Sequence, residues 1–180
     1  MIRTSFKNNK RVLLLYSIIL VIGIISGVIY SNKILTIDSS LIKQITVNSL
    51  LSFNIFRIVF IIITPFLTYI FIGPFFSLFN MFLEGLSMGV IILSLYLKAK
   101  LKGLIFSIVI IIIGKLIYCI LILILGIISI RYILDRKKDN LNNYKYLKKT
   151  FIIILLTIIN EFIIRKIAIK ICLYFSFLIN

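Results

Sequence analysis

The chain has 180 residues, of which 62% are apolar and 14% charged, and its mean hydropathy is +1.20. A soluble domain of this length cannot bury so much apolar surface, so the composition predicts an all-α, polytopic integral membrane protein. The sequence contains 21 Lys and Arg, 5 Asp and Glu and no His, which excludes catalytic sites and zinc sites built on histidine.

Five apolar segments approach the roughly 20 residues that a helix needs to cross a bilayer core. We expect the spans at residues 12–31, 53–72, 75–97, 104–130 and 151–170. The first follows a basic leader and ends in a polar stretch at 30–33 without a small-residue cleavage site, which predicts an uncleaved anchor and not a signal peptide. The second and third are separated only by Gly73 and Pro74 and should form a tight antiparallel hairpin.

The end of the fifth segment is ambiguous. Glu161, Arg165, Lys166 and Lys170 crowd its second half. One interpretation is a single tilted helix that reaches toward residue 179. The other is a shorter span followed by a tail helix in the interface, with its cations snorkelling to the headgroups.

Basic residues indicate the orientation, because Lys and Arg are retained on the cytoplasmic side of a membrane. An N-terminus inside the cell leaves four cations of the leader and seven of the polar loop 131–150 in the cytoplasm, against two in the loop 32–52 and three at 98–102. The abundance of Ile, Lys and Asn is typical of an A/T-rich bacterial genome. We therefore predict a bacterial cell-membrane protein with a cytoplasmic N-terminus and an external C-terminus. No segment outside the spans is long enough for a nucleic-acid-binding domain.

Four ionisable residues lie at membrane depth, where charges are costly and often functional. They are Arg57, Glu84, Lys115 and Glu161, two bases and two acids that can neutralise one another in a helix bundle. Arg57 lies close to the end of its span, so we expect it to snorkel. Lys115 is too deep for that and should pair with Glu84 or Glu161, the alternative being a role in a permeation path. For Glu161, Arg165 at i+4 is a second candidate partner.

Small residues four positions apart allow helix backbones to approach closely, which is how apolar helices associate in lipid. Gly23 and Gly27 form one such face, and Gly85 and Gly89 form another. We expect these faces to pack helices together, and packing within the chain is favoured over contact with a partner.

No motif for catalysis or metal binding accompanies these features. Cys119 and Cys172 lie in apolar runs without CxxC spacing, which predicts buried or lipid-facing thiols. Phosphate-binding loops, paired catalytic carboxylates and carboxylate-rich metal sites have no match in the sequence. We expect a protein that is not an enzyme and uses no cofactor or metal.

Several short motifs, taken in order, resemble the stage II sporulation protein M family. The stretch Phe-Asn-Met-Phe-Leu-Glu-Gly-Leu-Ser-Met-Gly at 79–89, followed by a hydrophobic run and Gly103, is similar to the central hairpin of that family. Asn54 with Arg57 resembles its polar pair ahead of the second span. Asn160 with Glu161 resembles the acidic residue near the end of its last span.

The resemblance implies a function without catalysis. Founding members of the family act as a membrane scaffold that localises cell-wall hydrolases during engulfment in a sporulating cell. Other members resemble subunits of export, maturation or immunity systems, for example for circular bacteriocins. We therefore expect either a scaffold whose partners are membrane lipids and cell-wall hydrolases, or a membrane subunit that works with a separate transporter ATPase. Only Gly114-Lys115 stands where members commonly carry a polar motif in the fourth span, which indicates a divergent member.

Overall fold

The computed structural model describes residues 2–37, 55–136 and 143–174, with the side chains of 2–9, 34–37, 164, 165, 168 and 172–174 left out. In this part of the chain every regular element is a helix, which confirms the all-α prediction. The elements are α1 (Ile2–Ile37), α4 (Ile55–Tyr69), α5 (Gly73–Gly114), α6 (Leu116–Arg136), α7 (Asn143–Ile159), the π-helix η1 (Asn160–Ile164) and α8 (Arg165–Tyr174).

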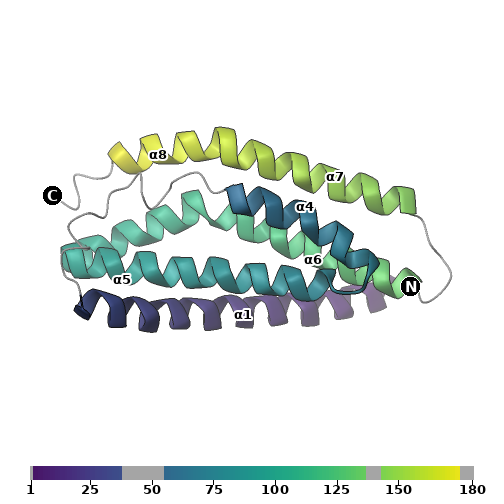
Figure 1. Cartoon of the computed structure of the whole chain (residues 1–180), viewed down its shortest axis with the longest axis horizontal. Helices are drawn as coiled ribbons and strands as arrows, with labels where there is room; N and C mark the ends of the chain where they lie inside the picture. Colours follow the sequence, from purple (N-terminus) through teal and green to yellow (C-terminus); the bar gives the residue numbers. More distant parts are fainter. Residues whose placement is uncertain (1, 38–54, 137–142, 175–180) are drawn as a thin grey trace.

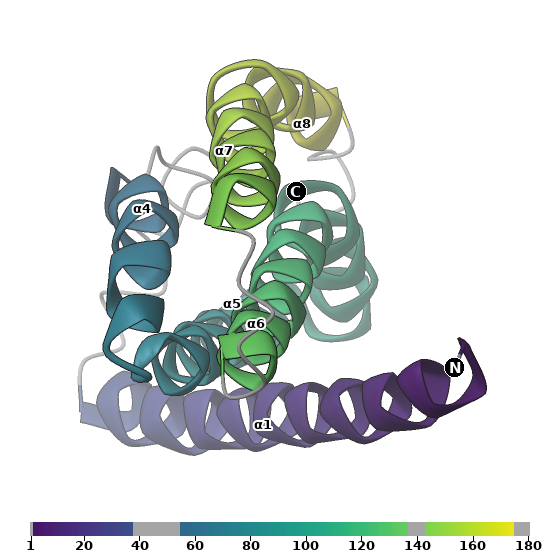
Figure 2. The same ribbon diagram turned by 90° about the vertical axis from the view of Figure 1, so that its right-hand side faces the viewer.

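The helices form an elongated bundle in which α5 and α6 lie between α1 on one side and the neighbouring pair α4 and α7 on the other (Figures 1 and 2). The start of α1, the turn between α4 and α5, the end of α6 and the start of α7 lie at one end of this bundle (Figure 1). The end of α1, a bend in α5 and the end of α8 lie toward the other. Successive helical segments therefore run in alternating directions.

The turn between α4 and α5 forms the hairpin that Gly73 and Pro74 predict. The N–H of Phe71 donates to Thr68 O at 3.1 Å and that of Ile72 to Leu67 O at 3.0 Å, which closes the end of α4. A Cβ added at Gly73 would lie 2.0 Å from Thr68 Oγ1, so the two helices approach too closely here for any larger residue. Pro74 fits the first turn of α5, where no intrahelical N–H bond is needed.

Helix α5 is bent where the sequence predicts a turn between two spans. Ala99 (φ −136°, ψ 17°) and Lys100 (φ 50°, ψ −127°) leave the helical conformation, and the second arm of α5 returns beside the first (Figure 1). Gly103 permits this return, because a Cβ there would lie 1.8 Å from Leu95 O. The glycine at this position thus has a steric role.

Two boundaries differ from the hydropathy-based expectation. The predicted span 104–130 is not one helix, since α5 ends at Gly114 and α6 begins at Leu116. The predicted loop 131–150 is largely helical, because α6 continues to Arg136 and α7 begins at Asn143. Apolar runs mark the part of a helix that avoids water, whereas the hydrogen-bonded helix continues into its polar ends.

Two of the described helices, Lys10–Lys33 within α1 and Leu116–Arg136, are long and apolar enough to cross a membrane. Helix α4, with 15 residues, is shorter than the usual span length. In the fifth segment α7, η1 and α8 follow one another as a bent helical rod as far as Tyr174 (Figure 1), and both interpretations of its end stay predictions.

Candidate functional site

Four charged side chains from different helical segments meet inside the bundle, and we call them the ionic cluster. They are Arg57 of α4, Glu84 of α5, Lys115 at the junction of α5 and α6, and Glu161 of η1. Each of these residues is at most 6% exposed. The structure thus brings together all four of the membrane-depth charges that the sequence singles out.

Arg57 is the centre of the ionic cluster. Its Nε and Nη2 atoms donate to Glu84 Oε1 and Oε2, both at 2.7 Å, and its Nη1 atom donates to Glu161 Oε1 at 3.0 Å. The planar guanidinium matches a carboxylate with two parallel bonds, which gives both strength and a fixed geometry. One side chain thereby ties α4 to α5 and to η1.

Lys115 completes the charge balance. Its Nζ atom lies 3.5 Å from Glu84 Oε2 and also donates to Ser87 Oγ, one turn further along α5. The cluster therefore contains two positive and two negative charges. An uncompensated charge at this depth would cost several kcal/mol, so neutrality is a condition for burying the cluster.

Two neutral residues extend the network. The Tyr118 hydroxyl donates to Arg57 O and accepts a bond from Asn80 Nδ2, both at 3.0 Å, while the Arg57 Cζ atom lies 4.8 Å from the centre of the Tyr118 ring. Sequence reasoning missed both residues. Their spacing is a usable signal, since Asn80 precedes Glu84 by four positions and Tyr118 follows Lys115 by three, which places each on the same helix face as a cluster charge.

The backbone is irregular at two of the four charges. Lys115 (φ −127°, ψ −30°) interrupts the path from α5 to α6, and Glu161 lies in the π-helix η1. π-helical turns are rare and are frequent at functional sites, because they change which residues of a helix face inward. The cluster is therefore built in part where a helix is interrupted and where a helix changes its winding.

One expectation about the charges is wrong. Arg57 does not snorkel: it is 3% exposed, because Glu84 and Glu161 bind its guanidinium inside the bundle. Lys115 pairs with Glu84, one of its two predicted partners, and Glu161 pairs with Arg57, a partner that the sequence did not name. The side chain of Arg165 and the whole of Asn54 lie outside the described residues. Asn160 is 4% exposed beside Glu161.

The two glycine faces pack against each other. A Cβ added at Gly27 would lie 2.1 Å from Leu86 O, and one added at Gly89 would lie 2.1 Å from Ile24 O, so the backbones of α1 and α5 are in direct contact. Gly23 and Gly85 approach in the same way, each with the other's Cα 3.1 Å from its added Cβ. Helix α5 therefore presents Gly85 to α1 and the adjacent Glu84 to the ionic cluster.

The chemistry of the cluster is that of a structural junction. Among the described residues, no buried side-chain nitrogen or oxygen lacks a hydrogen-bond partner, and no three His, Cys, Asp or Glu residues are grouped as a metal site would require. The donors and acceptors of the cluster are thus engaged with one another and hold four helical segments in register. No family model, no curated protein and no solved structure matches this chain.

Proposed function

We propose that this chain is a bacterial membrane protein with five spans that is not an enzyme and acts as a scaffold for partner proteins. The distribution of its side chains supports the membrane part of this proposal. Four charged groups are buried in the interior, whereas large apolar side chains are exposed along every α-helix, among them Ile18, Phe66, Leu101, Ile120, Phe151 and Ile167. Water would oppose this arrangement and lipid favours it.

Exposed cations are concentrated toward the two ends of the bundle. The first part of α1, the last part of α6 and the first part of α7, which meet at one end (Figure 1), carry Lys10, Arg11, Arg131, Arg136, Lys145, Lys148 and Lys149. The last part of α1, the bend of α5 and α8, which lie toward the other end, carry Lys33, Lys98, Lys100, Lys102, Lys166 and Lys170. Phospholipid headgroups occupy the corresponding levels on either side of an apolar layer. Alternating helix directions between these ends support five crossings: α1, α4, the first arm of α5, its second arm with α6, and the rod from α7 to α8.

The internal pairing of the ionic cluster carries the scaffold proposal. A transporter that moves ions needs membrane-depth charges that are available to the moving ion. Here Arg57, Glu84, Lys115 and Glu161 are occupied by one another, and the cluster joins helices. A rigid bundle with an apolar surface is suited to holding partner proteins in the membrane. The likeness of residues 50–165 to the stage II sporulation protein M family supports cell-wall hydrolases as those partners.

The test is the position of a hydrolase in the cell that makes this chain. The tagged chain is purified from native membranes, and an unrelated polytopic protein with the same tag is purified as the control. A peptidoglycan hydrolase that is enriched only with this chain is then fused to a fluorescent protein. Deletion of the gene for this chain should disperse that hydrolase from its membrane site. An unchanged position refutes the scaffold. A transporter ATPase as the enriched partner, with its gene adjacent, replaces the scaffold with the alternative of an export, maturation or immunity subunit.

A further inference from the structure

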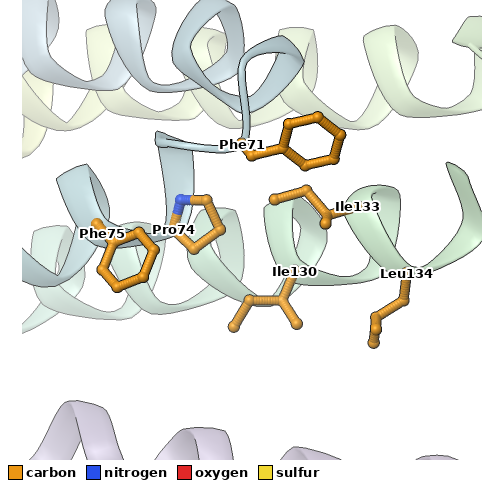
Figure 3. A pocket seen from close by; sticks show the side chains of 6 residues that line it. All are labelled: Phe71, Pro74, Phe75, Ile130, Ile133 and Leu134. Carbon is orange, nitrogen blue, oxygen red and sulfur yellow. The ribbon is translucent and has the colours of Figure 1, made fainter. Parts of the chain in front are cut away.

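An apolar groove of about 510 Å³ lies on the bundle surface where α4 turns into α5 (Figure 3). It is lined by Phe71, Pro74, Phe75, Ile130, Ile133 and Leu134. The first three come from the turn and the start of α5. The other three lie at positions i, i+3 and i+4 of α6 and so share one face of that helix. Every lining side chain is apolar.

A cation lies at the rim of this groove. The Arg136 Cζ atom is 5.1 Å from the centre of the Phe71 ring, and its Nη1 atom donates to Tyr69 O at 2.7 Å. Among the described residues, no carboxylate pairs with this guanidinium. Arg136 is exposed and is the last residue of α6, whose end lies at one end of the bundle (Figure 1). The groove and its rim therefore combine an apolar wall with an exposed guanidinium.

Phe71 shapes the groove at a conformational cost. Its φ of 66° lies in the left-handed region that glycine occupies easily and a phenylalanine does not. A glycine would make the same turn without strain but would remove the wall of the groove and the ring beneath Arg136. An aromatic side chain at a strained backbone position points to a use for the ring itself.

We propose that the groove binds one acyl chain of an anionic phospholipid from the surrounding membrane, with Arg136 binding the lipid phosphate. This inference rests on the proposed membrane location. Aliphatic and aromatic walls contact the methylene groups, and the guanidinium donates hydrogen bonds to the phosphate oxygens. The net negative charge of the headgroup gives the site its preference over zwitterionic lipid.

Fluorescence quenching tests the proposal, because the chain has no Trp. Phe75→Trp places a lone fluorophore in the groove, and Phe66→Trp on α4 is a matched control at the same end, since the two residues are 73% and 67% exposed. Each variant is reconstituted in vesicles with brominated phosphatidylglycerol or brominated phosphatidylcholine. At Phe75→Trp we expect the apparent affinity for phosphatidylglycerol to exceed that for phosphatidylcholine about fivefold, because one interfacial cation contributes about 1 kcal/mol. Adding Arg136→Gln should reduce it to the Phe66→Trp value.

Each outcome decides the question. Equal lipid preference at both positions overturns the lipid site and leaves the membrane proposal intact. A preference that survives Arg136→Gln likewise overturns it. Quenching by neither lipid at either position overturns both proposals. Leu134→Trp, on the α6 side of the groove, gives the same readout and replaces Phe75→Trp if that variant does not fold.

Discussion

Glu84→Gln is the substitution that the ionic cluster should tolerate least, because Glu84 contacts both of its cations. The carboxylate accepts two bonds of 2.7 Å from Arg57 and lies 3.5 Å from Lys115. Glutamine keeps the shape but leaves two cations for the single carboxylate of Glu161. Removing one partner of a buried ion pair costs about 3–5 kcal/mol, so we expect the free energy of unfolding to fall by about that amount.

Lys115→Met should rescue Glu84→Gln. It removes the second positive charge and leaves Arg57 paired with Glu161 at 3.0 Å, so the double variant is neutral again. The loss in the double variant should therefore be smaller than the sum of the single losses by about 1–3 kcal/mol. The measurement is unfolding by sodium dodecyl sulfate in mixed micelles, followed by circular dichroism.

A second double-mutant cycle, with one residue away from the ionic cluster, provides the control. Ser129 is fully buried and bonded to Thr68 at 3.0 Å, away from the cluster contacts. Ser129→Ala combined with Lys115→Met should be additive within about 0.5 kcal/mol. If Glu84→Gln and Lys115→Met are equally additive, charge balance does not govern the stability of the cluster and the reasoning fails.

Two further substitutions test the packing and the hydrogen bonds by the same unfolding measurement. Gly89→Ala should lower the free energy of unfolding by about 1–3 kcal/mol, because the new Cβ would lie 2.1 Å from Ile24 O. Its control, Ile25→Ala on the exposed side of α1, should change that free energy by less than about 0.5 kcal/mol. Similar losses at both positions would argue against close packing. Tyr118→Phe should cost about 1–3 kcal/mol, because an amide and a carbonyl lose their partner. The exposed Tyr96→Phe should be nearly neutral, and an equal loss there would contradict the network.

Features that depend on local chemistry could be predicted from the sequence. Gly73 and Pro74 indicate the hairpin, because two apolar runs joined by so short a turn have to lie side by side and antiparallel. The cationic stretch 98–102 indicates the second reversal, which the structure places at Ala99 and Lys100. Residues four apart on a helix share a face, so the glycine pairs could be identified as packing surfaces before any partner helix was known.

Features that depend on how helices meet could not be predicted. Hydropathy does not distinguish a straight helix from one broken at Lys115, because the residues on both sides are equally apolar. It also placed Arg57 near the end of a span, whereas the structure buries its guanidinium between Glu84 and Glu161. The pairing of Glu161 with Arg57 spans 104 residues and depends on η1, and no sequence spacing encodes that contact. Tyr118 lies in an apolar run, and only the structure shows that its hydroxyl bonds to Asn80 and to Arg57 O.

Labelling of single cysteines from one side of the membrane tests the central claim, that the two ends of the bundle lie on opposite sides of the membrane. Cys119 and Cys172 are first replaced by Ala, and Lys102→Cys in the second arm of α5 and Lys145→Cys in α7 then report on the two ends. An impermeant maleimide should label Lys102→Cys on intact cells and Lys145→Cys only after permeabilisation, because the N-terminal end is predicted to be cytoplasmic. Labelling of both residues from the outside of intact cells would contradict the account.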